Sequence, residues 1–449
     1  METSKAEKEN SREDLFVGLL DKILSPDNMA QAWKQVRVNK GAAGVDGMTV
    51  GEFPNFIREH WESIRDKLEK GTYNPSPVRR VLIPKEKGAF RTLGIPTVLD
   101  RVIQQAVAQV LSALHDPKFS EHSYGFRPRR SAHQAIESML EMSLNKGRGG
   151  RHCQVVDCDL KTFFDTVNHQ KMMGKLRESI ADRRLLELIS KFLKAGVILP
   201  NGTYEKSYEG VPQGGPLSPL LANILLDELD KELEKRGHAF VRYADDFVIL
   251  CHSRKAALRV LESVTRYLSQ GLRLAVNEAK SKVVKLSEAS FLGFRIQRKK
   301  IRWTDKSQKK LKARIRELTG RTRGVSPSKV IAELQSYLRG AMNYYACGIP
   351  YGEIRELDGW LRRRMRLYYW KQWGRPRTRR RRLISLGVDR DEVHRASRSR
   401  KGHWRMSYNR LLHRAMTDNW LSEQGLPNLT EQWVAIRYPE QPKGSKGQA

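Results

Sequence analysis

The chain has 449 residues, of which 39% are hydrophobic, so it is long enough to bury the cores of about two or three domains. Its formal net charge of +33 at pH 7 far exceeds the magnitude of about 2–8 that keeps a small domain soluble, and this excess indicates a large polyanion as partner. The four cysteines form no C-x-x-C pair and no stretch approaches the roughly 20 apolar residues of a membrane span, which argues against a zinc ribbon, a disulfide framework and a membrane protein.

The positive charge is concentrated in the carboxyl third. Residues 295–449 contain 38 Lys and Arg against 13 Asp and Glu, whereas the residues before them contain 45 against 37. A basic region attached to a more balanced body is typical of nucleic-acid binding. The amino terminus, "METSKAEKENSRED", lacks the apolar core of a signal peptide, so we expect an intracellular protein.

Periodicity, capping residues and glycines predict an alternation of helices and short strands. In the first half the predicted elements are mostly helical residues 13–70 with a loop at 39–50, strands at 78–84 and in "KEKGAFRTLGIPT", helices opened by Thr97 with Asp100 and by Ser131 with Gln134, and a strand at 153–160. In the second half they are a long helix within 210–237, strands in 239–250, a helix at 256–268, short strands in "KSKVVKL" and "FLGFRI", and basic helices from about residue 302. Ser218 is the predicted N-cap of the long helix, Pro219 lies in its first turn and Gly237 ends it.

Two adjacent acids interrupt an apolar run in "AFVRYADDFVIL". Asp245 and Asp246 would repel each other, and burial would add to the cost, so something must compensate them. A tight hairpin would place them at strand ends, although the pair lacks the glycine that such turns favour. A third acid, Asp159, ends the strand-like "VVDCDL", and if the two segments are neighbours in one sheet the three acids converge.

Carboxylates gathered in this way would suit magnesium. Hard divalent cations prefer carboxylate oxygens, and magnesium also binds substrate phosphates. Two such ions about 3.5–4 Å apart would activate a 3′-hydroxyl and stabilise a leaving pyrophosphate oxygen. The alternative is that the acids form surface turns or structural salt bridges.

The ordered motifs resemble those of reverse transcriptases encoded within bacterial group II introns. They are, in chain order, "RRVLIPKEKGAFRTLGIPTVLDRVIQQAV", "SYGFRPRRSAHQAI", "DLKTFFD", "PQGGPLSPLLANILLDELD", "YADD", "FLGF", "YLRGAMNYY", "LRRRMRLYYWKQW" and "KGHWRMS". The first six look like the fingers and palm of that family, and the last three are similar to its maturase domain. The likeness covers roughly residues 25–435 and keeps the family's motif order.

The resemblance implies an α+β fold, a right-hand polymerase. Fingers and palm with an antiparallel sheet would span 1–300, including an amino-terminal extension over about 1–75. An α-helical thumb or maturase domain at 301–375 and a small basic DNA-binding region at 376–449 would follow. Because residues after Cys347 include no cysteine, and the histidines there lack metal spacing, the type without an endonuclease is expected.

The resemblance also assigns the catalytic centre. Asp159 and Asp245 would be catalytic metal ligands, and Asp246 would complete the triad, with two Mg²⁺ ions as cofactor.

Further residues are implied to contact the incoming nucleotide: Lys85, Arg91, Phe164, Gln213 and Lys280. The Lys85 and Arg91 cations would grip the triphosphate. The Phe164 ring would lie under the sugar and exclude a 2′-hydroxyl. Gln213 would hydrogen-bond the nucleotide or template, and Lys280 would act as general acid for pyrophosphate. Core packing for Phe164 and surface positions for the cations are the alternatives.

The carboxyl third carries arginines beside aromatic residues, a combination that suits RNA. The predicted RNA-binding residues are Arg362, Arg363, Arg364 and Arg366, beside Tyr368, Tyr369, Trp370 and Trp373. We expect exposed arginines and some packed aromatics; a simple thumb helix is the alternative. The arginines of "GRPRTRRRR" are expected to form a flexible basic linker.

The function so indicated is that of an RNA-directed DNA polymerase that binds its parent group II intron RNA and assists splicing and mobility by target-primed reverse transcription. Expected partners are the intron RNA, an RNA template with a DNA or RNA primer, target DNA and deoxynucleoside triphosphates, but no membrane; the oligomeric state is left open. The expected setting is the bacterial cytoplasm, near the nucleoid. The alternatives are a splicing-only maturase with a vestigial polymerase centre and a free-standing reverse transcriptase of host repair or defence.

Overall fold

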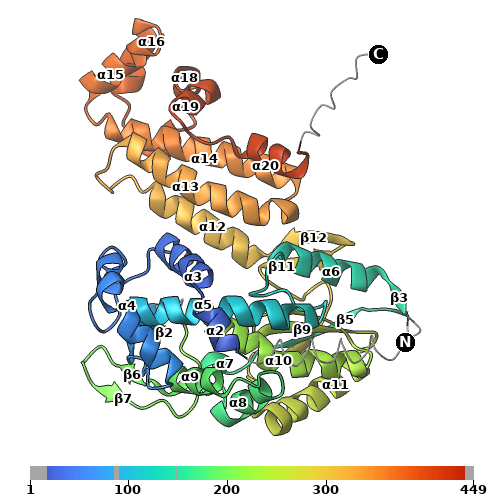
Figure 1. The fold of residues 1–449 in the computed structure, drawn as a ribbon. Coiled ribbons are helices and arrows are strands. Elements are labelled where there is room, and N and C mark those ends of the chain that lie inside the picture. The colour runs from blue at the N-terminus through green and yellow to red at the C-terminus, as the bar shows by residue number, and fades with distance from the viewer. Residues whose placement is uncertain (1–17, 85–89, 148–149, 440–449) are drawn as a thin grey trace, which may run out of the picture. The chain divides into compact units, whose positions relative to one another are not determined.

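The computed structural model describes residues 18–84, 90–147 and 150–439 (Figure 1). The chain divides into two compact units, Met1–Leu286 and Ser287–Ala449. Mainly antiparallel sheets in the first unit, with one parallel pair between β1 and β6, and a mainly helical second unit agree with the predicted α+β class. The division into fingers, palm, thumb and DNA-binding region stays a prediction.

The first unit is built mostly from helices. They are α2 (Leu19–Ile23), α3 (Pro26–Val38), α4 (Phe53–Glu69), α5 (Val98–His115), α6 (Ala132–Leu144), α7 (Phe163–Thr166), α8 (His169–Arg177), α9 (Arg183–Lys194), α10 (Ser218–Lys235) and α11 (Arg254–Tyr267). The Thr97 hydroxyl accepts from the Asp100 N–H group at the start of α5, and Ser131 and Gln134 form a full capping box at α6. Both caps confirm the prediction. Each involves residues only three apart, so its pattern is visible in the sequence.

The predicted cap of α10 is wrong. Leu217 is the N-cap, and Ser218 is the first helical residue. The Ser218 hydroxyl donates to the Pro212 carbonyl at 2.7 Å, so it closes the glycine-rich loop in front of the helix. Gly237 follows the last turn with φ 70°, as expected of a glycine that ends a helix.

Two four-stranded sheets carry the segments of interest, with strand orders β2-β1-β6-β7 and β10-β5-β9-β8. Their strands are β1 (Val78–Pro84), β2 (Phe90–Ile95), β6 (Val197–Ile198), β7 (Tyr204–Glu205), β5 (Gln154–Cys158), β8 (Ala239–Tyr243), β9 (Asp246–Cys251) and β10 (Lys282–Lys285), and a separate short pair is β3 (Lys146–Gly147) and β4 (Gly150–Arg151). The second sheet is antiparallel throughout. Helix α11 packs on β5, β9 and β10, and α6 packs on β8. Apolar side chains such as Phe240 and Phe247 are buried in this sheet.

The second unit is mainly helical. Its elements are the hairpin strands β11 (Phe294–Gln297) and β12 (Lys300–Trp303) and the helices α12 (Asp305–Leu318), α13 (Pro327–Tyr345), α14 (Tyr351–Gln372), α15 (Pro376–Ser385), α16 (Arg390–Ser397), α17 (His403–Met406), α18 (Arg410–Ala415), α19 (Asp418–Glu423) and α20 (Leu429–Arg437). Helix α14 contacts both α17 and α20, and its Tyr368 and Trp370 are fully buried. Among the described residues, no helix has the length and apolar character needed to cross a membrane.

The expected flexible linker is a helix. The arginine run lies in α15, which has Pro376 in its first turn, a position that suits proline. The Arg379 guanidinium lies 4.4 Å from the centre of the Trp370 ring. High charge alone therefore did not predict the local structure, since arginine is also a good helix former.

Candidate active site

The predicted hairpin is present, and the two adjacent acids divide between its turn and its second strand. Tyr243 pairs with Asp246, which leaves Ala244 and Asp245 as the two turn residues. Ala244 has φ 59°, a left-handed conformation that is uncommon outside glycine. Asp245 is half-buried and Asp246 is exposed. The turn therefore presents both carboxyl groups at the end of the sheet.

The register of β5 against β9 brings Asp159 to the same end. The last pair of this antiparallel ladder is Cys158 with Phe247, so the next residue of each chain segment is Asp159 on one side and Asp246 on the other. Desolvation at the crowded turn and the nearby carboxylates of Asp245, Asp157 and Asp159 together raise the pKa of Asp246 to about 6. The condition stated for convergence, that the two segments be neighbours in one sheet, is met.

The backbone around Asp159 is held by the segment that precedes β10. The Asp159 N–H group donates to the Ser281 hydroxyl at 3.1 Å, and its carbonyl accepts from the Asn277 N–H group at 2.8 Å. The Lys280 ammonium donates to the Asp159 carboxylate at 3.2 Å. Lys280 thus lies beside the acid group, while Ser281 and Asn277 were not singled out from the sequence because nothing local links them to residue 159.

The donor set fits a hard divalent cation in its chemistry. It offers carboxylate oxygens, and the raised pKa of Asp246 reflects in part a local excess of negative charge that a cation would relieve. Across the described parts of the chain, however, no three His, Cys, Asp or Glu side chains are arranged as a ready metal-binding group. The three-ligand site therefore stays a prediction.

Two of the predicted nucleotide contacts line one pocket. Phe164, at the start of α7, and Gln213, in the glycine-rich loop, both border a pocket of about 300 Å³. Phe163 next to it is buried in the core. The Gln213 carbonyl accepts from the Gly94 N–H group of β2 at 2.7 Å. Gly214 has φ 127°, and a Cβ there would collide with the Gly94 carbonyl, so the loop needs glycine to approach the strand.

One of the two predicted triphosphate-gripping cations, Arg91, belongs to the β1–β2 hairpin. Arg91 pairs with Ile83 across the hairpin and is exposed. Lys85 lies outside the described residues. Arg91 is therefore available to an anion.

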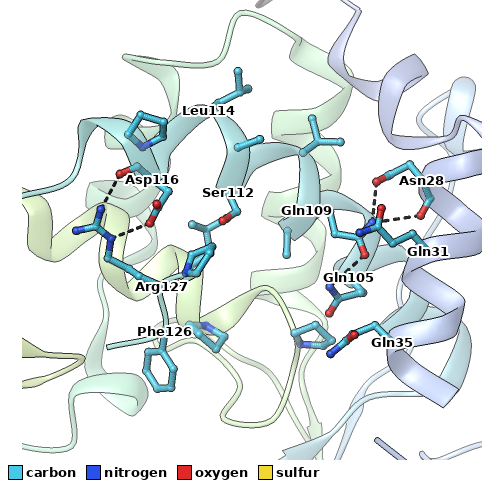
Figure 2. Close-up of a pocket in the computed structure, with 18 of the residues that line it drawn as sticks. Asn28, Gln31, Gln35, Gln105, Gln109, Ser112, Leu114, Asp116, Phe126 and Arg127 are labelled. Atoms are coloured by element: carbon cyan, nitrogen blue, oxygen red, sulfur yellow. Dashed lines mark hydrogen bonds and ion pairs between the residues drawn. The ribbon is translucent and has the colours of Figure 1, made fainter. Parts of the chain in front are cut away.

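A separate groove of about 1290 Å³ is present in the first unit (Figure 2). It lies along α3, α5 and the loop around Phe126, and none of the predicted site residues is among the described residues that line it. The Gln109 amide donates to Asn28 and accepts from Gln105, and Arg127 donates to Asp116. These polar groups brace the groove wall.

The expected exposure of the α14 arginines is wrong for two of the four. Arg362 and Arg366 are buried: Arg362 pairs with Asp358 at 3.0 Å, and Arg366 pairs with Asp418 at 2.7 Å. Burial with a carboxylate partner is how proteins accommodate such charges. These two side chains hold α14 to its surroundings.

The other two arginines are partly accessible but have partners within the second unit. The Arg364 Nε group donates to the Thr319 hydroxyl at 2.8 Å. The Arg363 guanidinium lies 3.5 Å from the centre of the Trp404 ring and 3.1 Å from that of Tyr408. We expected some of the neighbouring aromatic residues to be packed, and all four are buried: Tyr368, Tyr369, Trp370 and Trp373.

Two family models match the chain. Residues 83–296 match the family described as "Reverse transcriptase (RNA-dependent DNA polymerase)", and residues 308–385 match "Group II intron, maturase-specific domain".

Individual proteins are similar over much of the chain. Protein YkfC of Escherichia coli strain K12 is 35% identical over 322 residues, which cover 64% of this chain and 84% of that protein. The group II intron-encoded protein LtrA of Lactococcus lactis subsp. cremoris is 37% identical over 282 residues, which cover 63% of this chain but only 45% of LtrA. Among solved structures, a chain of a "Partial Cas6-RT-Cas1--Cas2 complex" is 27% identical with a TM-score of 0.36, covering 56% of this chain and 42% of that one.

Proposed function

The chain belongs to the family of group II intron reverse transcriptases and maturases, and we propose from this premise that it is an RNA-directed DNA polymerase that also binds its parent intron RNA. In that role it assists intron splicing and promotes mobility by target-primed reverse transcription. The strongest support is the β5–β9 register, which sets Asp159 beside Asp246. The proposed setting is the bacterial cytoplasm, in association with the nucleoid and the target DNA.

In nucleotide addition, the residues of the first unit have different roles. Asp159, Asp245 and Asp246 would hold two magnesium ions. When bound there, the ions would activate the primer 3′-hydroxyl and stabilise the leaving pyrophosphate. Lys85 and Arg91 bind the triphosphate of the incoming nucleotide by charge.

The remaining contacts position the nucleotide and help the product to leave. Gln213 orients the nucleotide or the template, and Phe164 lies under the sugar. Lys280 donates a proton to pyrophosphate, a role supported by the 3.2 Å distance between its ammonium and the Asp159 carboxylate.

A primer-extension assay on an RNA template tests the proposal. The purified protein should extend an annealed DNA primer with deoxynucleoside triphosphates when a divalent cation is present. A protein that binds the template but never extends the primer would instead fit the splicing-only maturase. Sequencing the RNA that co-purifies with the protein would identify the intron.

Replacing Phe164 by Ala should relax the choice of sugar. Without the ring, a ribose 2′-hydroxyl meets less steric resistance, so the preference for dGTP over GTP should fall by about 10–100-fold, which corresponds to the loss of about 1–3 kcal/mol of discrimination. The measurement is the ratio of kcat/KM for the two nucleotides. Phe163→Leu is the matched control, since that ring is core and its loss should cost stability without changing the ratio. An unchanged ratio in Phe164→Ala would show that the Phe164 ring does not select the sugar.

RNA affinity should depend steeply on salt and on the exposed arginines of α15. Arg377, Arg380 and Arg381 are exposed and free to meet phosphates, unlike Arg362 and Arg366. Affinity for the RNA should fall about a thousandfold or more between about 50 and 200 mM salt, if at least about six phosphates are contacted. Each of the three Arg→Gln changes should lower the slope of log Kd against log salt by about one.

The control for this series is Arg183→Gln on α9, an exposed arginine of the first unit whose side chain is 90% accessible. It should leave the slope unchanged. If Arg183→Gln lowered the slope as much as the α15 substitutions, RNA affinity would depend on the total charge of the protein and not on a binding surface at α15.

A further inference from the structure

Arg242 is a fully buried cation one residue before the YADD sequence. Its guanidinium pairs with the Asp230 carboxylate of α10, and both side chains are 0% exposed. The Nε group donates to Asp230 Oδ1 at 2.7 Å. Taking two charges out of water is costly, and replacing such a pair by apolar residues is often neutral or stabilising. Stability alone is therefore a weak reason for this pair.

The rest of the guanidinium is directed at the hairpin turn. Its Nη1 group donates to the Ala244 carbonyl at 3.0 Å and to the Asn223 amide oxygen at 2.9 Å. The Asn223 amide in turn donates to the Gly125 carbonyl at 2.9 Å. The Arg242 and Asn223 side chains together connect α10, the turn and the segment around Gly125.

That segment closes on the other side of the turn. The Arg242 N–H group donates to the His122 carbonyl, and the Tyr124 N–H group donates to the Arg242 carbonyl, each at 2.9 Å. A Cβ at Gly125 would collide with the backbone nitrogen of Ala244. Ala244 itself has φ 59°, a conformation that costs free energy for any residue with a Cβ. The turn is held in an unfavourable backbone state by its surroundings.

We infer that Arg242 is a positioning residue for catalysis, which acts by binding the Ala244 carbonyl and so fixes the turn that presents Asp245 and Asp246 beside Asp159. It touches neither substrate nor cation. The inference also explains a physical link between three separate motifs, since "SYGFR", "LLANILLDELD" and "VRYADD" each supply part of this one network. The inference rests on the proposed polymerase function, because its test measures kcat for primer extension.

The test is a double variant that removes the donor while keeping the interior apolar and filled. Arg242→Met combined with Asp230→Leu should keep the melting temperature near that of the wild type and leave RNA binding unchanged, because no charge is left unpaired. The kcat for primer extension should nevertheless fall about tenfold or more, as expected when a hydrogen bond that fixes the turn is lost, while KM for the primer–template stays the same. A folded double variant with wild-type kcat would overturn the inference.

A second comparison serves if the double variant does not fold. Arg242→Lys keeps the charge opposite Asp230 but cannot make all the bonds of the planar guanidinium, so its kcat should also fall. Adding Ala244→Gly should then restore part of the lost kcat, because glycine adopts positive φ without strain. A purely structural role predicts no such rescue, and its absence would contradict the inference.

Arg101→Lys is the matched control. Arg101 is also buried, but its guanidinium donates to the backbone carbonyls of Thr97 and Ala42 and not to the turn. Its kcat in folded protein should match the wild type. The wild-type protein in the same assay separates the two claims: an inactive wild type refutes the polymerase function, whereas an active wild type with an equally active Arg242 double variant refutes only the role of Arg242.

Discussion

Asp245→Asn should abolish cDNA synthesis while RNA binding survives. The substitution keeps the size of the side chain and removes one of the negative charges that meet at the end of the β5–β9 ladder. Loss of a ligand that holds a catalytic cation should remove about 4 kcal/mol of transition-state stabilisation, roughly a thousandfold in rate. The measurement is single-nucleotide primer extension on an RNA template, with template affinity measured in parallel.

Two further variants make this result specific. Asp159→Asn should have the same effect, because residue 159 lies beside Asp246 in the ladder. Asp66→Asn, which changes an exposed acid of α4 paired with Lys70, should leave extension unchanged. Polymerisation that persists in Asp245→Asn would contradict the assignment of this turn to the catalytic centre.

Asp358→Ala should destabilise the second unit by about 3 kcal/mol. The change takes the nearer carboxylate from buried Arg362, whose side chain is 7% exposed. Only the more distant and exposed carboxylate of Asp418, at 3.6 Å, then remains as its partner, and removal of a partner from a buried ion pair is strongly destabilising. It also removes the acceptor of the Leu429 N–H group, now 3.0 Å from Asp358 Oδ1. Denaturant unfolding followed by tryptophan fluorescence measures the loss, since tryptophans Trp370 and Trp433 of this unit are buried.

The control for this prediction lies on the same helix. Glu356 is exposed on α14, and Glu356→Ala should change the free energy of unfolding by no more than about 0.5 kcal/mol. If Asp358→Ala were as mild as this control, the buried pair would not hold α14 in place. The four neighbouring arginines would then have to be reconsidered as an RNA-binding group.

Features that depend on neighbouring residues were predictable from the sequence. The capping box at Ser131 and Gln134 and the β1–β2 hairpin involve residues a few positions apart, so their patterns are visible in a short window. The meeting of Asp159 and Asp246 was predictable only as a condition, since it depends on which strands are neighbours. The structure supplies that strand order.

Features that join distant segments could not be read in this way. The bonds from Arg242 to Asp230, Asn223 and Ala244 depend on how α10 packs beneath the hairpin, and nothing in a linear pattern gives that packing. The error at α14 was of another kind, because a signal was present. Asp358, Arg362 and Arg366 are four residues apart in succession, so they share one helical face, and an acid in that row indicates pairing within the protein.

The most direct test of the account is to locate the cation itself. Fe²⁺ can replace Mg²⁺ at oxygen-rich sites and, with ascorbate and peroxide, produces hydroxyl radicals that cut the backbone nearby. We predict cuts in two separate segments, close to residue 159 and close to the turn at 244–245, and the loss of both sets of cuts in Asp245→Asn. Cleavage at only one of the two segments, or at neither, would contradict a shared cation site and with it the proposed catalytic centre.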